Sequence, residues 1–424
     1  MSHSSHNHSD VLVVGGGAVG LACAYYLVRS GRSVRIIDQE TVGAGASHGN
    51  CGIIFVSDLP PLCVPGAVRH ELMRTLRGTS PLYIKPRPDP GLGIWLLRFA
   101  AHCNPGHRAR AIRVRDSLLR LSHRLLRSLI SDEHLDCEYD QRGVLMAFTD
   151  PEILAGYAAT NRLLAPFGRA GAFYDRRAVH NLEPALGERV CGGWYHPSDG
   201  HLRPERFMES WCRAARARGV VITEHHQLER FEGRNASVRA VRTRQGGRFT
   251  ADRFVLAAGT GSPAIARQLG IRIPVQPGKG YSITMARPAV CPAIPCYLYE
   301  CNVVVTPWQS GYRLGGTMEF SGFDDTLNER RLATIERSAA GYLKTPLGRP
   351  VTERWAGHRP MSVDDLPIID RMPHIHNLYV ATGHGMLGIS MATGTGRLIA
   401  DMLLGQTPPI DPRPFSIRRF GRQY

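Results

Sequence analysis

The sequence predicts an α/β fold with two interleaved domains. A strand–glycine–helix–strand unit opens the chain at residues 10–37, and a strand–glycine–helix unit closes it at residues 378–404. Several segments between these units have the β-branched, turn-flanked pattern of successive strands. Because both ends of the chain carry the same kind of unit, we expect one domain built from both termini, with a second domain inserted between them.

Composition limits the classes of protein that fit. The chain has 424 residues, 43% of them hydrophobic, which excludes a disordered protein and suggests two domains. No apolar run approaches the roughly 20 residues of a membrane-spanning helix. The net charge of +16 is compatible with nucleic acid, an anionic membrane surface or an anionic substrate as partner, but more simply with an arginine-rich background.

The N-terminus and the cysteines point to a cytoplasmic protein. The first ten residues are polar and do not resemble a secretory signal. The ten cysteines lack paired spacing and fall mostly in apolar stretches, as reduced thiols do. Cys291, Cys296 and Cys301 recur every five residues without the close pairs of zinc or iron–sulfur sites, so we expect no metal.

Apolar periodicity and glycine or proline boundaries predict the elements in order. Residues 60–105 are rich in proline and glycine, and we expect an irregular excursion there. The elements of the first half are strands at 10–14, 34–37, 143–148 and 220–223 and helices at 18–29, 108–129, 150–165 and 204–218. Those of the second half are strands at 237–243, 248–251, 253–257 and 378–381, strand-like segments within 283–314, and helices at 332–343 and 389–404.

The first unit carries a nucleotide-binding motif. Gly15, Gly17 and Gly20 follow a strand and open a helix, and Asp38 lies eighteen residues beyond Gly20 at the end of the next strand. The glycines permit a tight turn and close approach of a pyrophosphate, and the helix N-terminus offers free N–H groups to the anion. The Asp38 carboxylate accepts hydrogen bonds from a ribose, and its charge repels a 2′-phosphate.

Two further glycine-rich segments favour a long, flavin-type cofactor. Residues 43–52 follow the second strand and are almost all small, which lets a second part of a ligand approach the backbone. Residues 383–388 lie between the last strand and the last helix, whose positive end suits a group that gains negative charge on reduction. A third near-match begins at Gly259, where packing beside the adenosine is the simpler interpretation.

The chain resembles the FAD-dependent D-amino-acid oxidase superfamily, and within it the bacterial D-amino-acid dehydrogenases and their paralogues. The resemblance covers nearly the whole chain and depends on VLVVGGGAVGLACAYYL, GASHGNCG, PVQPGKGYSIT, WAGHRPMSVDDLPIID and NLYVATGHGMLGISMATGTGRLIADMLLG. It implies a Rossmann-type FAD-binding domain interleaved with an antiparallel-sheet substrate domain. We expect residues 1–80, 196–275 and 351–424 in the FAD-binding domain, and 81–195 and 276–350 in the substrate domain.

The resemblance also implies which residues contact FAD. The expected contacts are Gly15, Gly17, Ala18, Val19, Gly20, Asp38, Gln39, Gly45, Ser47, Asn50, Cys51, Gly52, Leu228, Gly259, Gly383, Gly385, Met386, Leu387 and Gly388. The acid at position 38 is often Glu in this superfamily, and the shorter Asp changes its reach but not its chemistry. Relatives with covalent flavin carry Cys or His at set places. This sequence has no Cys near His384, and His48 is displaced by one position, so we expect non-covalent FAD.

Arg359 is the candidate for binding a substrate carboxylate. It stands in a Gly-x-Arg-Pro segment that matches the family's carboxylate-binding arginine, and a planar guanidinium forms two parallel charge-assisted bonds with a carboxylate. The alternative is a structural arginine paired with Asp364 or Asp365. The resemblance places tyrosines around the substrate, and the candidates for lining that site are Tyr281, Tyr297, Tyr299, His384 and His48. Lys279 is expected to point either toward the flavin or to solvent.

The implied reaction is oxidation of the Cα–N bond of a D-amino acid, with hydride passing to flavin N5 and the imine hydrolysing to a 2-oxo acid and ammonia. Cyclic or N-methyl amino acids (4-hydroxy-D-proline, D-proline, sarcosine) are alternative substrates. A tRNA-modifying flavoenzyme and a non-catalytic FAD-binding subunit are alternatives of other classes, although no nucleic-acid-binding module is present. A dehydrogenase passes electrons to a quinone or another acceptor. The helix at 108–129 then either contacts the inner face of the cell membrane through its leucines or packs those leucines into the core.

Overall fold

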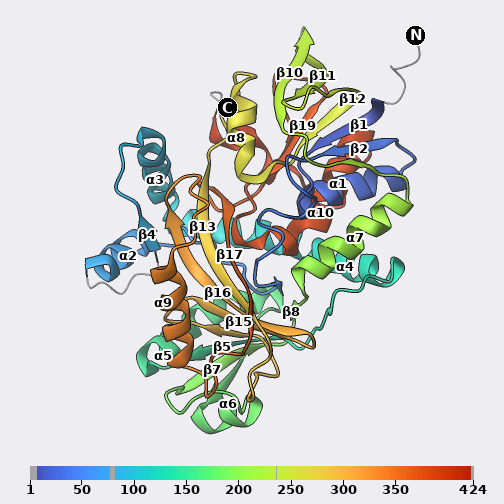
Figure 1. The fold of residues 1–424 in the computed structure, drawn as a ribbon. Coiled ribbons are helices and arrows are strands. Elements are labelled where there is room, and N and C mark those ends of the chain that lie inside the picture. The colour runs from blue at the N-terminus through green and yellow to red at the C-terminus, as the bar shows by residue number, and fades with distance from the viewer. Residues whose placement is uncertain (1–6, 77–81, 235, 422–424) are drawn as a thin grey trace.

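The strands of the protein form two large sheets, seen in the computed structural model (Figure 1), which describes residues 7–76, 82–234 and 236–421. The first sheet has the order β10-β11-β12-β1-β2-β9, with β19 beside β12 and β18 beside β19. Its strands are β1 (His8–Val14), β2 (Val34–Ile37), β9 (Val221–Thr223), β10 (Leu228–Arg234), β11 (Ser237–Thr243), β12 (Arg248–Leu256), β18 (Ile368–Arg371) and β19 (Leu378–Thr382). Because β1 and β2 come from the start of the chain and β19 from its end, the interleaved α/β prediction is confirmed.

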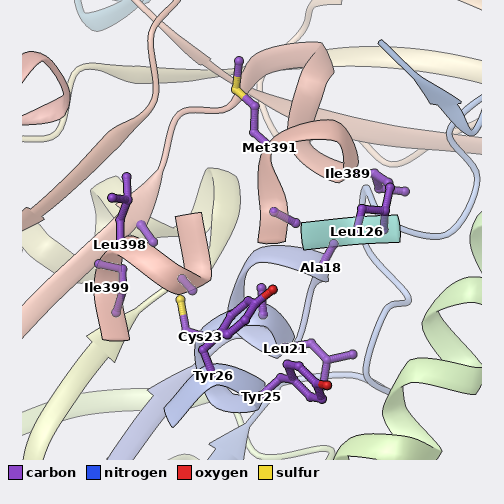
Figure 2. Packing of buried hydrophobic residues seen from close by; sticks show 14 of the residues in the cluster. Ala18, Leu21, Cys23, Tyr25, Tyr26, Leu126, Ile389, Met391, Leu398 and Ile399 are labelled. Atoms are coloured by element: carbon purple, nitrogen blue, oxygen red, sulfur yellow. The ribbon is translucent and has the colours of Figure 1, made fainter. Parts of the chain in front are cut away.

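Three helices pack together on one face of this sheet: α1 (Ala18–Arg29), α4 (Pro105–Asp132) and α10 (Gly388–Leu404). Figure 2 shows side chains from all three helices in one cluster, among them Leu21 and Tyr25 of α1, Leu126 of α4 and Leu398 of α10. Helix α7 (Pro204–Ala217) adds Trp211 to the same core. The C-terminal helix therefore completes a layer begun by the first helix.

The second sheet is mostly antiparallel and has the order β17-β13-β16-β15-β14-β5-β7-β6, with β4 beside β16. Its strands are β4 (Leu82–Ile84), β5 (Val144–Phe148), β6 (Ala172–Asp175), β7 (Gly192–His196), β13 (Val275–Met285), β14 (Cys296–Leu298), β15 (Val303–Trp308), β16 (Gly311–Phe320) and β17 (Val351–Ser362). Strand β13 pairs with β17 from Val275 to Met285 and with β16 from Lys279 to Met285. Strand β17 carries the candidate Arg359, and β13 carries Tyr281 and Lys279.

Shorter elements complete the described chain. They are the pair β3 (Ile53–Ile54) and β8 (Gly200–His201), and helices α2 (Ala67–Leu76), α3 (Pro90–His102), α5 (Pro151–Leu164), α6 (Arg176–Leu182), α8 (Ser262–Arg267) and α9 (Glu329–Ala340). The expected irregular excursion at 60–105 is wrong for α2 and α3. Asp89 caps α3 by accepting from the Leu92 N–H at 2.9 Å, and Pro90 takes the first helical position, where a missing N–H costs nothing.

The domain boundary at residue 351 also differs from the structure. Strand β17 hydrogen-bonds along β13 and so belongs to the second sheet, although we expected it in the FAD-binding domain. The sequence of one strand does not indicate which sheet the strand joins, because strand pairing depends on contacts with residues that are distant in the chain.

Helix α4 packs its leucines inward. Leu118, Leu119, Leu126 and Leu129 are each 1% exposed or less and lie in the core with α1 and α10, which excludes the expectation that these four leucines enter a membrane. Within the described chain, no helix is long and apolar enough to cross a membrane.

Candidate active site

The glycine-rich turn joins β1 to α1. Gly15 has a φ of +103°, and its N–H donates to Ile37 O of β2 at 2.9 Å. A Cβ on Gly20 would lie 1.9 Å from Gly15 O, so only glycine allows the helix to approach the turn this closely. The side chain of Ser47 reaches the start of α1, where its Oγ accepts from the Ala18 N–H at 2.9 Å. The helix N-terminus therefore presents backbone N–H groups and a hydroxyl in one place, which suits an anion.

Asp38 lies directly after β2 and faces this turn. Its carboxylate accepts from the Gly16 N–H at 2.6 Å and from the Glu40 N–H at 2.9 Å. Burial raises the pKa of Asp38, while the two backbone hydrogen bonds oppose that rise. An acceptor fixed beside the glycine-rich turn fits the ribose hydroxyls of a dinucleotide. The neighbouring Gln39 is exposed.

The segment from Ser47 to Gly52 is attached to the second sheet by three buried or partly buried side chains. Ser282 donates to Gly49 O at 2.7 Å, Arg313 to Asn50 O at 2.8 Å, and Thr306 to Cys51 O at 2.7 Å. Sequence reasoning missed these three residues. One signal for them was available in the sequence: a polar residue between apolar residues of a strand. Arg313 stands between Tyr312 and Leu314 of the core and is itself 0% exposed, so its polar atoms need partners inside the protein.

Asn50 and Gly52 shape the same segment from within. The Asn50 side chain donates to Ala46 O and Ser47 O, both at 3.1 Å, and accepts from the Gly52 N–H at 2.9 Å. Gly45 is exposed, and no other residue would contact a Cβ placed there. The loop therefore has a fixed backbone next to the start of α1, together with open space at Gly45.

The second glycine-rich turn, at residues 383–388, leads directly into α10. Gly383 has a φ of +77°, Met386 is 44% exposed, Leu387 is buried, and space around Gly388 is open at the helix start. Gly259 accepts from the Thr382 hydroxyl at 2.8 Å, which joins the turn after β12 to the end of β19. Leu228 begins β10 and packs its side chain against the apolar core of the first sheet.

Histidine 384 is buried rather than poised for proton transfer. Its Nε2 lies 2.9 Å from the Thr395 hydroxyl of α10, and burial lowers its pKa to about 3. A neutral imidazole held by a threonine has a packing role, and the structure gives no reason to treat it as an acid or base.

Arg359 reaches across β13 to β16. Its NH1 donates to Thr317 O at 3.0 Å, and a Cβ on Gly280 would lie 2.2 Å from the same nitrogen. Within the described ranges, no carboxylate lies within ion-pair distance of Arg359. The alternative pairing is wrong, because Asp364 pairs with Arg419 and Asp365 with Arg115, each at 2.7 Å. Burial lowers the pKa of Arg359. Because no carboxylate of the described chain lies beside it, its charge lacks the ion-pair partner that usually offsets the cost of desolvation.

The tyrosine candidates divide between the two faces of the second sheet. Tyr281 alternates with Gly280, and its hydroxyl donates to Glu319 at 3.0 Å inside the apolar core on the face away from Arg359. Lys279 shares that face, where its Nζ donates to Thr326 O at 2.5 Å. The expectation that Tyr281 joins Arg359 is therefore wrong, because Tyr281 is one residue out of phase with Gly280, where Arg359 crosses β13. Lys279 is 1% exposed, so its side chain does not point to solvent.

Tyr297 and Tyr299 belong to an aromatic cluster that also contains Phe148 and Tyr157. The rings of Tyr299 and Phe148 are 4.6 Å apart, and those of Tyr299 and Tyr157 are 5.3 Å apart. The Tyr297 hydroxyl donates to Asn302 at 2.8 Å. Burial is the main reason that its pKa is raised, and the charge of Arg359 opposes that rise, which places Tyr297 within electrostatic range of the guanidinium.

We infer an internal space between these groups from their accessible surface. Cys51, Asp58, Tyr297 and Arg359 all lie deep in the protein, yet each keeps accessible surface, which reaches 30% for the Asp58 side chain. Accessible surface on deeply placed side chains indicates a space within the protein rather than its outer boundary. A Cβ on Gly315 would lie 2.3 Å from Cys51 Sγ, so a glycine on β16 admits Cys51 to this space.

His48 does not reach that space. Its Nε2 lies 2.7 Å from Glu353 Oε1 of β17, and this hydrogen bond raises the His48 pKa and lowers that of Glu353. Both residues line a separate surface cleft of about 530 Å³, together with Trp355 and residues of α7. The expectation that His48 lines the substrate site is therefore not met.

The donor set fits a long dinucleotide cofactor. Backbone N–H groups, small residues and the Asp38 acceptor surround the start of α1, and the open turn before α10 provides a second helix N-terminus. Among the described residues there is no group of three His, Cys, Asp or Glu side chains arranged to bind a metal ion.

Comparison with known proteins agrees with this geometry. Residues 10–402 match the family described as FAD dependent oxidoreductase. The chain is 33% identical to a D-amino acid dehydrogenase of Methylobacterium nodulans over 97% of this chain and 99% of that protein. It is 30% identical to a D-amino acid dehydrogenase of Vibrio atlanticus over 97% of this chain and 100% of that protein.

Solved structures share the fold. Glycine oxidase from Geobacillus kaustophilus superposes with a TM-score of 0.78 at 20% identity, covering 97% of this chain and 99% of that one. L-proline dehydrogenase from P. horikoshii superposes with a TM-score of 0.74 at 18% identity, covering 98% of both chains. The chain belongs to the FAD dependent oxidoreductase family.

Proposed function

We propose that the protein is an FAD-dependent dehydrogenase that oxidises the Cα–N bond of D-amino acids. The observation that carries this proposal is the guanidinium of Arg359, which lies deep in the protein, keeps accessible surface toward the inferred internal space and has no carboxylate partner within the described ranges. The substrate carboxylate supplies that partner. The relatives at 30–33% identity, each named D-amino acid dehydrogenase over nearly the full length, support the same substrate class.

The residues that would hold FAD are those gathered around the two helix N-termini. Gly15, Gly17, Ala18, Val19, Gly20 and Ser47 would receive the pyrophosphate, Asp38 and Gln39 the ribose, and Leu228 and Gly259 the adenosine. Gly45, Asn50, Cys51, Gly52, Gly383, Gly385, Met386, Leu387 and Gly388 would border the flavin. Bound FAD supplies the two-electron acceptor of the oxidation.

The protein contributes orientation and exclusion of water. Arg359 binds the substrate carboxylate, and its bond to Thr317 O fixes the plane of the guanidinium. Tyr297 and the aromatic cluster border the rest of the space and keep bulk water out. The neutral amino acid loses two electrons and two protons in forming the 2-imino acid, and water then releases the 2-oxo acid and ammonia. Positioning provides most of the rate enhancement, and no side chain is needed as a strong base.

The electron acceptor is a quinone or another carrier outside the chain, as the dehydrogenase names of the relatives suggest. Any contact that α4 makes with the inner face of a membrane is electrostatic, because this helix exposes arginines such as Arg113 and Arg124 while its buried leucines remain in the core. A salt-sensitive liposome pelleting assay tests this peripheral contact.

The deciding experiment records the visible spectrum of the purified protein and follows anaerobic bleaching. D-amino acids, D-proline, 4-hydroxy-D-proline and sarcosine are compared with the L-enantiomers. Bleaching by D-amino acids supports the proposal. A colourless protein, or a yellow one that only cyclic or N-methyl amino acids reduce, contradicts it. Acid precipitation that leaves the flavin in the supernatant supports non-covalent binding.

A further inference from the structure

The internal space beside Arg359 also contains a carboxylate. Asp58 lies deep in the protein, but 30% of its side chain is accessible. Phe55, three residues before Asp58, packs against the aromatic cluster. The charge of Asp58 also contributes, after burial, to the raised pKa values of Tyr297, Tyr299 and Tyr157. Arg359 acts on Tyr297 in the opposite sense. Tyr297 therefore lies within electrostatic range of both a cation and an anion.

The charge of Asp58 is only partly neutralised within the protein. Arg115 forms its short ion pair with Asp365 at 2.7 Å and a longer one with Asp58 at 3.4 Å. Two carboxylates thus share one guanidinium, and the group keeps a net charge of −1. A charge-assisted hydrogen bond of full strength is about 2.7–2.9 Å long, so the contact between Asp58 and Arg115 leaves Asp58 able to bind a second cation.

The loop that carries Asp58 is rigid. The Val56 and Ser57 N–H groups donate to Asp199 at 2.7 and 2.8 Å, and the Ser57 hydroxyl donates to the same carboxylate at 2.5 Å. Asp199 is completely buried. Three hydrogen bonds to one buried carboxylate hold the backbone next to Asp58, so the position of Asp58 is set before any ligand arrives.

We propose that Asp58 selects D-amino acids whose side chain carries a positive charge, an ammonium or a guanidinium. This inference rests on the proposed function. With the substrate carboxylate on Arg359, the side chain extends past Tyr297, and its terminal cation pairs with Asp58. The aromatic rings of the cluster pack against the aliphatic stem and favour a cation nearby.

The α-amino group is the less suitable partner for Asp58. Loss of hydride from Cα requires the neutral amine, and an ion pair with a carboxylate would hold the amine in its charged form. A side-chain cation takes no part in the reaction, so pairing it with Asp58 adds affinity without that penalty.

The test compares D-lysine with D-norleucine, which has the same carbon chain but no side-chain charge, using the FAD-loaded enzyme. The assay is run at pH 8, above the pKa of Asp58, which burial raises to about 6. We expect kcat/KM for D-lysine to exceed that for D-norleucine by about tenfold or more, the effect of one charge-assisted bond. Asp58→Asn should remove most of this ratio and leave D-norleucine within about twofold of the original enzyme.

Two further variants serve as controls. Asp58→Glu keeps the charge and should retain a preference for D-lysine. Asp252→Asn removes an equal charge at a position where 67% of the side chain is exposed, and it should leave the ratio unchanged. FAD content and melting temperature of each variant show whether it is folded. If Asp58→Asn lowers both substrates equally, or if the original enzyme prefers D-norleucine, the inference is overturned.

A binding measurement separates this inference from the proposed function. 6-Aminohexanoate and hexanoate both carry a carboxylate, but only the former carries a terminal ammonium, and neither has an α-amine to oxidise. We expect 6-aminohexanoate, or a shorter homologue of matched span, to raise the melting temperature more than hexanoate does, and Asp58→Asn to abolish the difference. If this difference is found but no D-amino acid reduces the flavin, the proposed function is contradicted while the charge selection is supported. Equal effects of both compounds overturn the charge selection.

Discussion

Arg359 of β17 donates a hydrogen bond to the carbonyl oxygen of Thr317 of β16, although β13 lies between these two strands. The guanidinium crosses β13 at Gly280, where a side chain would occupy its place. Thr317 has a φ of +65°, unusual for a β-branched residue, and lies where the pairing of β16 with β13 shifts register. This local irregularity turns the carbonyl oxygen of Thr317 toward Arg359. The hydrogen bond to that oxygen fixes the orientation of the guanidinium and therefore the direction of its other N–H groups.

Replacing Arg359 by alanine should raise KM for D-amino acids by about a hundredfold, the order expected for loss of a bidentate charged contact. FAD should remain bound, because Arg359 is not among the residues expected to contact FAD. Steady-state kinetics with an artificial dye and the ratio of absorbance at flavin and protein bands measure the two effects. Arg359→Lys should recover only part of the affinity, because an ammonium is a point charge. An unchanged KM for Arg359→Ala would exclude its role.

Gly280→Ala should displace the Arg359 guanidinium without removing its charge. The new methyl group would lie 2.2 Å from NH1, so the side chain must move from its place on β13. We expect an increase in KM of about tenfold with little change in FAD content, because misplaced groups bind less well. Gly93→Ala on α3 is the matched control, since a Cβ there meets no other residue. Equal KM values for the two variants would show that Gly280 is not required.

Asp38→Ala should weaken retention of FAD. The substitution removes a carboxylate that is fixed by the Gly16 and Glu40 N–H groups and that is available to a ribose. We expect a larger fraction of FAD to pass through an ultrafiltration membrane, while Asp132→Ala at the exposed end of α4 behaves like the original protein. Equal retention in both variants would remove Asp38 from the cofactor site.

The ion pair between His48 and Glu353 should stabilise the protein over a limited pH range. Its hydrogen bond raises the pKa of His48, so the histidine contribution is complete below about pH 6.5 and is lost as the pH rises through the raised value. The same bond lowers the pKa of Glu353, so the glutamate contribution is lost as the pH falls through that lowered value. His48→Gln should therefore lower the melting temperature more at pH 6 than at pH 9. A decrease that is the same at both pH values would contradict this assignment.

Local sequence signals predicted the first sheet better than the second. The turn at Gly15, the helix that follows it and the last strand and helix all have short-range signatures, and the structure places them together. Strand β17 was assigned to the wrong domain because its partner, β13, lies about 75 residues earlier in the chain, beyond any local signal.

The candidate site shows the same division. Arg359 was identifiable from a motif, but its neighbour Thr317 was not, because a backbone oxygen has no sequence signature. Tyr281 was misassigned although β alternation already separates it from Gly280. Asp58 and Asp199 were missed entirely, because their roles depend on contacts with residues distant in the chain. Asp58 shares Arg115 with Asp365. Asp199 accepts from the loop at Val56 and Ser57.

The interleaved first sheet determines when the cofactor site exists during synthesis. Strand β19 and helix α10 emerge last from the ribosome, and α10 must then dock against α1 and α4, which were made much earlier. Until that moment the apolar faces of α1 and α4 lack their third partner. These faces therefore stay accessible while the middle of the chain is being made, and the cofactor site is complete only once translation has passed α10.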